Sequence, residues 1–301
     1  MKSLMKTIKF FMCALALGLP CSVCFGQTWS TLPVDLVISM ETSTPGTALT
    51  PAIVAAGTNS STCIPGGSGP TGCAYSSVAP GMTVGANRSA CSNLGPVQLN
   101  NGGTLYPAQS LNYNNIAIPD TDFGTISNFV FNDGIRPLNF TIMGCFTLGM
   151  PVQGGNNNDY DMIMIQDSEG LYADMQYNDN SGSPVVRIEN HSVAHSSNIS
   201  VEAGGTYFMS LNWNTSAATA TLTIYTAQGA LVGQSSVSDP SSGSGVTNVR
   251  LPSNENGTDS GTTYYQNIMM NWTTAPETLF WTSDSGTVQP PSGLSATVSV
   301  Q

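Results

Sequence analysis

Two consecutive stretches decide the fold class: residues 206–213 read TYFMSLNW and residues 220–225 read ATLTIY. Both are rich in β-branched and aromatic residues, and in both apolar side chains alternate with smaller or polar ones. A period of two places alternate side chains on opposite faces of a strand. Ala227, Gln228 and Gly229 then form a turn signal before residues 230–233. The pattern predicts three consecutive antiparallel strands.

Similar short strand patterns occur on both sides of this segment. They lie at residues 34–41, 112–118, 138–146, 160–165, 171–177, 184–189, 246–251, 263–272 and 279–281. Beyond residue 26, no window of eleven or more residues keeps a helical period. Many short strands separated by turn signals predict a sandwich or a barrel with almost no helix.

The residue pattern and spacing of these strands resemble those of laminin-G-like, concanavalin-A-like jelly rolls. The tryptophan-bearing strand at 205–214, the strand at 220–229 ending in a glycine turn, and residues 264–272 carry the resemblance, and residues 36–41 are similar to the first strand. The resemblance covers residues 34–282 and implies an all-β, two-sheet antiparallel jelly-roll sandwich. Members bind sugars, proteins or lipids, or cleave glycans, so the fold alone does not choose a function.

The chain divides into three parts. Residues 1–26 carry three lysines within the first nine positions, continue with a short apolar run and end in small residues. This order is typical of a secretory signal peptide. Lipidation at Cys21 or Cys24 competes with this interpretation. The jelly roll is expected over 27–284. Residues 285–301 form a linker, or a truncated segment similar to the start of a fibronectin type III domain.

Charge excludes some partners. Charged residues make up 8% of the chain, whereas about 25% is usual. Beyond residue 26, four arginines face 18 acidic residues, a net charge of −14. Nucleic-acid binding requires a basic surface, so it is excluded. No second apolar stretch reaches the ~20 residues of a membrane helix. We therefore expect a secreted, extracellular protein without a membrane span.

Four cysteines remain beyond the signal segment: Cys63, Cys73, Cys91 and Cys145. An even number in an exported chain favours two disulfides over a zinc site. Three connectivities can be drawn. Cys63 and Cys73 bracket a Gly/Pro loop, so we predict Cys63–Cys73 and Cys91–Cys145.

Catalytic patterns are absent from the sequence. Glycoside hydrolases of the resembled family carry a Glu-x-Asp-x-x-Glu strand, and the nearest approach, residues 166–169, is predicted to be a turn. A Ser-His-Asp hydrolase needs a histidine base, and only His191 and His195 exist, in a polar stretch without a nucleophile elbow. We therefore predict no enzyme activity.

An Asn-rich stretch at 156–161 offers a candidate metal site. Calcium takes six to eight oxygen ligands, and Asp159, Asp161 and Glu41 are the predicted carboxylate ligands. Members of the resembled family often hold calcium. An ordinary Asn-rich turn is the competing interpretation.

Aromatic side chains near the same loops offer a ligand site. Tyr160, Tyr172 and Tyr177 flank polar loops, where aromatic faces can stack on sugar rings. The sequence thus predicts a secreted, non-catalytic jelly-roll module that binds extracellular glycan, or a surface protein in adhesion. The alternatives are a glycan hydrolase or lyase with an unrecognised site, and a purely structural extracellular module.

Overall fold

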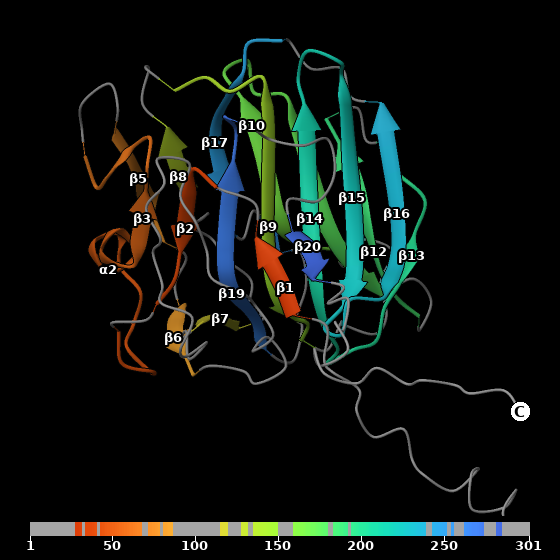
Figure 1. The fold of residues 1–301 in the computed structure, drawn as a ribbon, viewed down its shortest axis with the longest axis horizontal. Coiled ribbons are helices and arrows are strands. Elements are labelled where there is room, and N and C mark those ends of the chain that lie inside the picture. The colour runs from red at the N-terminus through yellow and green to blue at the C-terminus, as the bar shows by residue number, and fades with distance from the viewer. Residues whose placement is uncertain are drawn as a thin grey trace, which may run out of the picture.

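The fold is an antiparallel β-sandwich, seen in a computed structural model (Figure 1). The structure describes residues 28–31, 34–40, 43–67, 72–78, 81–86, 115–119, 128–131, 135–149, 159–179, 183–191, 194–238, 243–251, 254–255, 262–273 and 281–284. Of these, only the backbone is described for 28–31, 75, 115–119, 128, 159–160, 179, 254–255 and 281–284.

The first sheet lies behind the second in Figure 1. In spatial order it contains β13 (Ile199–Ser200), β12 (Pro184–Asn190), β11 (Tyr172–Asp179), β10 (Asp159–Asp167), β17 (Val246–Arg250), β8 (Asn128–Phe131), β5 (Gly72–Ser77) and β4 (Ile64–Pro65), with β18 (Asn254–Glu255) paired to β10. All of its pairings are antiparallel except β4 with β5.

The second sheet carries the strands predicted from the tryptophan-bearing stretch. Its order is β16 (Leu231–Ser238), β15 (Thr219–Thr226), β14 (Thr206–Asn214), β9 (Asn139–Thr147), β19 (Thr262–Asn271), β2 (Leu36–Ile38) and β3 (Thr58–Ser60), while β7 (Asn115–Pro119) pairs with β19 and with β6 (Thr83–Gly85). A separate two-stranded sheet joins β1 (Thr28–Thr31) to β20 (Trp281–Asp284).

The turns form where the sequence predicts them. Gly229, between β15 and β16, has a φ of 89°, a conformation that glycine adopts without steric cost. In the turn between β10 and β11, Gly170 has a φ of 85°. There Asp167 Oδ1 accepts hydrogen bonds from Glu169 N (2.9 Å) and Leu171 N (3.0 Å). Residues within each turn therefore fix the geometry of both hairpins.

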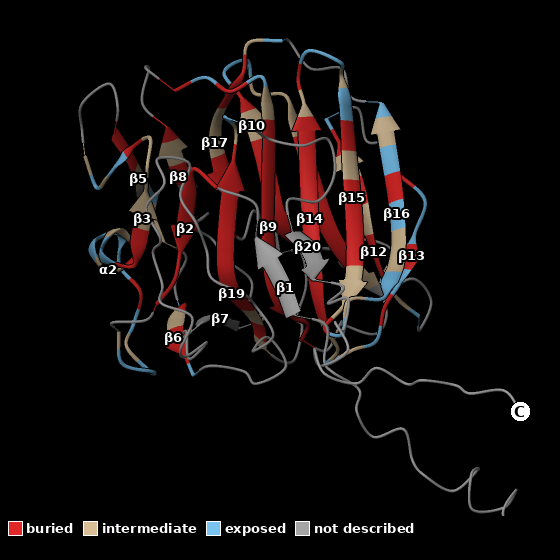
Figure 2. Cartoon of the chain, viewed as in Figure 1, coloured by how far each residue is buried: buried red, intermediate tan, exposed pale blue. Residues whose placement is uncertain are grey.

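The core lies between the sheets, and strands β9, β14 and β19 are buried along nearly their whole length (Figure 2). Trp213 is fully buried, and Trp272 packs partly buried against the same cluster. The rings of Phe140 and Trp272 stack at 6.0 Å, and Phe131 meets both rings edge-on. Trp213 and Trp272 thus belong to the core rather than to a surface.

Hydrogen bonds tie the two sheets together. Strand β10 has a bulge between Asp161 and Ile163, and Tyr265 on β19 donates its hydroxyl to the carbonyl of the bulged Met162 (2.9 Å). At one edge, Asn190 Nδ2 donates to Ser238 O (2.6 Å). The bulge matters for the site, because it sets which side chains of β10 face outward.

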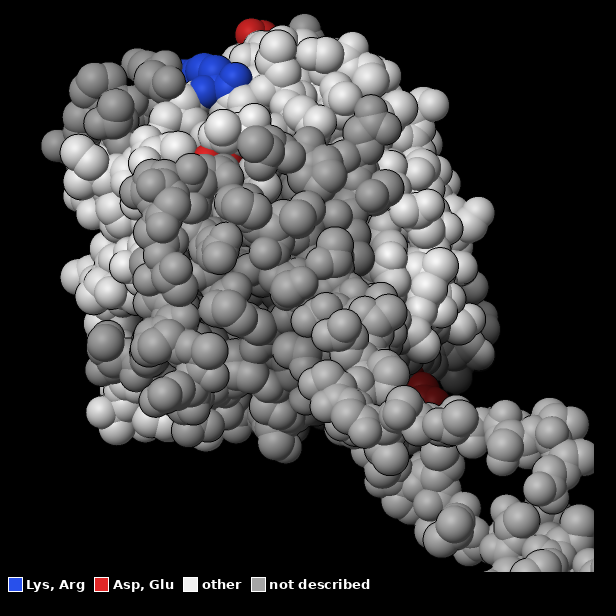
Figure 3. Space-filling view, viewed as in Figure 1, with Lys and Arg blue, Asp and Glu red and all other residues white. Residues whose placement is uncertain are grey.

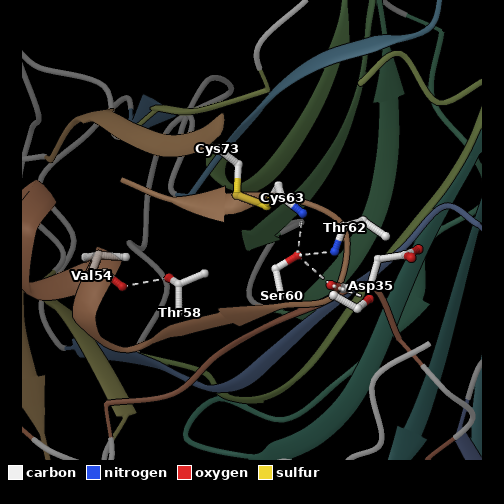
Figure 4. Close-up of a disulfide and its surroundings, with 8 residues drawn as sticks. Asp35, Val54, Thr58, Ser60, Thr62, Cys63 and Cys73 are labelled. Atoms are coloured by element: carbon white, nitrogen blue, oxygen red, sulfur yellow. Dashed lines mark hydrogen bonds between the residues drawn. A yellow bond between two sulfur atoms is a disulfide. The ribbon is translucent and has the colours of Figure 1, made fainter. Parts of the chain in front are cut away.

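The opposite edge contains a disulfide (Figure 4). Cys63 and Cys73 are bonded, with Cα atoms 5.7 Å apart. Ser60 Oγ organises the approach: it donates to Asp35 O (2.7 Å) and accepts from Thr62 N and Cys63 N. The predicted Cys63–Cys73 pairing is confirmed. Cys145 is also disulfide-bonded, and its predicted partner, Cys91, lies outside the described residues.

The all-β, two-sheet antiparallel sandwich predicted from the sequence is confirmed. Among the described residues, one short helix occurs, α2 (Pro51–Ala56), which begins after Thr50; the Thr50 hydroxyl accepts from Ile53 N (3.2 Å). In the part of the chain that the structure describes, no helix is long and apolar enough to cross a membrane. The predicted signal segment (1–26) and the predicted linker segment (285–301) lie outside the described residues.

Candidate functional site

The outer face of the first sheet carries an unusual concentration of polar groups. Alternation along each strand places the core residues inward and the polar ones outward. We call the outward set the polar face; it comprises Tyr172, Asp174 and Gln176 of β11, Arg187 and Glu189 of β12, Asp161, Met164 and Gln166 of β10, and Asn248 and Arg250 of β17. In a chain with so few charges, this face brings together three acids and two arginines.

A hydrogen-bonded row crosses three strands of the polar face. Asp161 lies opposite Gln176, which lies opposite Arg187. Arg187 Nε donates to Gln176 Oε1 (3.0 Å), and Gln176 Nε2 donates to Asp161 Oδ1 (3.0 Å). Since a guanidinium can only donate, it fixes the orientation of the amide. The row therefore holds Asp161 as a hydrogen-bond acceptor.

Asp174 is the most buried carboxyl group of this face, with 2% of its surface exposed. Burial raises its pKa well above the ordinary value, and the nearby Asp161 and Glu189 raise it further. Arg250 opposes this rise, and a hydrogen bond to Asp161 contributes to it. Asp174 is thus favoured as a neutral carboxylic acid beside the carboxylate of Asp161.

Three buried polar atoms of this face have no hydrogen-bond partner: Asp174 Oδ1, Asn248 Oδ1 and Arg250 Nε. They belong to β11 and β17, on either side of β10. Among the described side chains only seven such atoms occur, so nearly half of them gather here. Native structures leave few buried polar groups unpaired, and a cluster of them calls for an explanation.

The β12 end of the face is more open. His195 Nε2 lies 2.7 Å from Glu189 Oε2, and Tyr172 packs edge-on against the exposed ring of His191 at 5.4 Å. Tyr172 is half-buried and lies opposite Gln166. A half-buried aromatic side chain therefore lies at the edge of the polar face.

The structure separates the three tyrosines predicted as a ligand site. Tyr172 lies on the polar face. Tyr177, the residue after Gln176, faces inward instead: it is buried and donates its hydroxyl to Gly149 O (3.1 Å). Tyr160 lies opposite Tyr177 in the sheet, and its side chain is outside the described residues. Tyr177 is therefore unavailable to a ligand, because it belongs to the core.

The predicted calcium ligands are brought together only in part. Asp159 and Asp161 both lie on β10, but the side chain of Asp159 and all of Glu41 are outside the described residues. Asp161 is engaged by Gln176 and Asp174. Among the described side chains, no group of three or more His, Cys, Asp or Glu residues could hold a metal ion. Calcium binding stays a prediction.

The pairing of these two carboxyl groups was not predicted, because the catalytic pattern considered places both carboxylates on one strand. Asp161 and Asp174 belong to neighbouring strands, and the β10 bulge brings them onto one face. Asp174, Gln176, Arg187 and Glu189 do alternate within their strands, and that signal could have found half of the face. Arg250 belongs to a strand far along the chain, and no sequence pattern placed it on this face.

The polar face differs from the opposite side of the molecule. Among the described residues visible in Figure 3, which views the second sheet, few side chains are charged. The charged residues of the polar face lie on strands β10, β11, β12 and β17.

No model of a known protein family matches the sequence, and no curated protein matches it. Among solved structures, the chain is similar to the binding domain of botulinum neurotoxin serotype G (10% identity, TM-score 0.40, 79% of this chain and 47% of that chain). It is also similar to metal-free lectin I-B4 from Griffonia simplicifolia (11% identity, TM-score 0.37, 52% and 87%) and to arcelin-5, a lectin-like defence protein from Phaseolus vulgaris (8% identity, TM-score 0.36, 52% and 85%). The chain thus spans about half the length of the botulinum neurotoxin binding domain.

Proposed function

We propose that the protein is a secreted, non-catalytic jelly-roll module that binds extracellular glycan on the polar face of its first sheet. One observation supports this most: the hydrogen-bonded row of Arg187, Gln176 and Asp161. Carboxylate, amide and guanidinium groups, fixed in orientation by one another, are suited to sugar hydroxyl groups, which both donate and accept.

An aromatic side chain elsewhere on the polar face fits the same ligand class. Tyr172 offers an aromatic ring at the border of the face, and aromatic rings pack well against the apolar faces of sugar rings. A surface protein remains the other partner class predicted from the sequence. Glycan is favoured because the described part of this face is a grid of polar groups rather than an apolar patch.

The non-catalytic assignment rests on the spacing of the two aspartates. A retaining glycosidase separates its carboxyl groups by about 5–5.5 Å and an inverting one by about 6.5–9.5 Å. Asp161 and Asp174 share a hydrogen bond, which leaves no room for a sugar carbon or a water molecule between them. The pair is better suited to fixing the charge of the face than to cleaving a bond.

A glycan hydrolase or lyase is the second candidate function, and one observation favours it. The raised pKa of Asp174 is a property of general acids. In that case Glu189, opposite Asp174 on β12, is the carboxylate available as its partner.

A glycan array with the protein lacking residues 1–26, with and without calcium, tests the proposal. Array hits are then measured by calorimetry with Arg187→Gln and with the control Arg136→Gln, whose arginine is exposed and belongs to none of the strands of the polar face. We expect Arg187→Gln alone to weaken binding, by roughly tenfold, because it removes a charge-assisted donor. An array without hits contradicts the proposal, and release of reducing sugar from a hit contradicts its non-catalytic part.

A further inference from the structure

We propose that residues 87–114 dock on the outer face of the second sheet and that a Cys91–Cys145 disulfide ties them there. This inference does not rest on the proposed function, because it concerns the sheet that does not carry the polar face. It starts from side chains of β2, β9, β14 and β19 that point away from the core and are nevertheless fully buried.

The strand register identifies these side chains. On β9, β14 and β19, residues of the main core cluster are interleaved with residues that do not belong to it. Residues opposite each other on neighbouring antiparallel strands share a face, as do residues two apart on one strand. Cys145 lies opposite Phe208 and two residues from Met143. Met269 lies opposite both Met143 and Val37. We call these five residues the outer face.

All five outer-face residues have 0% of their surface exposed. A sheet face turned away from the core is buried only where something lies on it, and the structure contains a single chain. The cover is therefore part of this chain. In Figure 1 the two-stranded β1–β20 sheet is drawn in front of β9 and β14 but not in front of β19. The burial of Met269, on β19, therefore points to a further covering segment.

The disulfide of Cys145 selects that segment. Cys145 is disulfide-bonded, and Cys63 and Cys73 are bonded to each other. Beyond the predicted signal segment, Cys91 is the one cysteine of the sequence that is left. In the secreted chain the partner of Cys145 is therefore Cys91. Since Cys145 belongs to the outer face, the bond brings the residues around Cys91 onto that face.

The described ends of the segment lie within reach of Cys145. Residues 87–114 connect β6 to β7, where Gly85 lies opposite Asn115. Strand β7 pairs with β19, and β19 pairs with β9, which carries Cys145. From β6 to β9 there are three strand spacings, about 14 Å. Cys91 follows Gly85 by six residues, and six extended residues reach roughly 20 Å. The connection is therefore long enough to cross the sheet.

The composition of the segment matches an apolar face. Residues 87–114 contain four leucines, one valine and two tyrosines, and their one charged residue is Arg88. They also form the longest run outside the described residues between two described strands. Burying apolar side chains against Phe208 and Met269 is favourable, whereas a segment rich in charge would lose hydration there. The shorter run at 120–127, by contrast, carries two aspartates.

Docking of this segment makes the second sheet an inner layer. One of its faces packs on the first sheet, and residues 87–114 close the other face beside β1–β20. The outer face is then a second, smaller core and is closed to ligands and to other proteins.

Two neighbouring methionines of β19 give a matched test. Met269 belongs to the outer face, whereas Met270 belongs to the main core cluster. The protein is produced with a photoreactive diazirine analogue in place of methionine. A Met270→Leu chain keeps only the outward probe of the pair, and a Met269→Leu chain keeps only the inward one. Light releases N2 from the analogue, and the carbene that forms inserts into a neighbouring residue.

Mass spectrometry of the non-reduced protein then locates the cross-links. We expect the probe at Met269 to join residues 87–114, the probe at Met270 to join residues of the main core cluster, and a disulfide peptide to connect Cys91 with Cys145. Cross-links from Met269 to β1, β20, another segment or a second copy overturn the docking. A probe at Met269 that reacts with water alone also overturns it, because the face is then open. A map in which Cys145 has another partner overturns the tether.

These outcomes do not depend on glycan binding. The glycan array and the Arg187→Gln variant decide the proposed function, whereas the cross-links decide what covers the second sheet, so either proposal can fail while the other stands.

Discussion

Gln176 and Asp161 lie directly opposite each other on β11 and β10, and the Gln176 amide donates to Asp161 Oδ1 over 3.0 Å. Arg187 holds the other end of the amide, so the amide cannot turn to present its oxygen to Asp161. Asp161 is thereby kept as an acceptor, and the proton of the aspartate pair is placed on the more buried Asp174.

Replacing Asp174 with Asn should change how stability depends on pH. The pKa of Asp174 is raised well above 3.8 by burial and by Asp161 and Glu189. Between 3.8 and the raised value, the folded chain keeps a proton that the unfolded chain loses, so the stability supplied by this group falls as pH rises. Asn cannot ionise, so the stability of the variant does not show this fall as pH rises.

Urea unfolding at a series of pH values from acid to neutral measures this difference. We expect the free energy of unfolding of Asp174→Asn, relative to wild type, to increase as pH rises through the window. Parallel curves for the two proteins would show that Asp174 ionises normally.

Tyr172 and Tyr177 should respond differently to substitution. Tyr177→Phe removes one buried hydrogen bond, to Gly149 O, and is expected to lower stability by about 1 kcal/mol without changing glycan affinity. Tyr172→Ala removes the ring at the border of the polar face and should weaken glycan binding several-fold. Calorimetry and urea unfolding of both variants check this pair. A loss of affinity in Tyr177→Phe contradicts the placement of the site.

Asp35 should be a major determinant of stability. Fully buried, it accepts hydrogen bonds from Trp272 N (2.6 Å), Thr273 N (2.7 Å) and Thr273 Oγ1 (2.6 Å), which join the segment before β2 to the end of β19. We expect Asp35→Ala to cost roughly 3 kcal/mol and Thr273→Val, which removes only the hydroxyl, about 1 kcal/mol. Equal losses in the two variants would refute a special role for the carboxylate.

Removing the Cys63–Cys73 disulfide should destabilise the sandwich edge. The bond closes a short loop, with a sequence separation of 10, and its loss should cost roughly 3 kcal/mol in the chain-entropy model. Urea unfolding of the Cys63→Ala/Cys73→Ala variant measures the loss. Mass mapping of non-reduced wild-type peptides checks both predicted pairs, and a peptide joining Cys73 to Cys91 would contradict them.

Calcium binding is tested by Asp159→Ala/Asp161→Ala. If the predicted site exists, calcium raises the Tm of the wild-type protein over that in EDTA, because a ligand bound only by the folded state stabilises it, and the double variant loses this increase. Gln176→Leu, which keeps both carboxylates while removing the partner of Asp161, serves as the control. A wild-type Tm that does not respond to calcium contradicts the site.

The sequence by itself determined the strands, the hairpin turns and the Cys63–Cys73 pair, because these depend on neighbours along the chain. Alternation at 206–213 and 220–225 gave the strands their faces. Gly170 and Gly229 marked turns that require positive φ, and two cysteines bracketing a short loop have few other partners within reach.

Only the tertiary structure decided which groups meet on the polar face. Strand β10 is buried on both faces, so its composition does not tell which of its side chains point to the core, and the bulge at Met162 resets their parity midway along the strand. The same step of one residue separates Tyr177, in the core, from Gln176, in the polar row. Asp174 lies beside Met164 through the local β10–β11 hairpin, whereas Arg250 is brought to the other side by the pairing of β10 with β17, a strand distant in sequence. That pairing is fixed by how the sheets bury their apolar faces together.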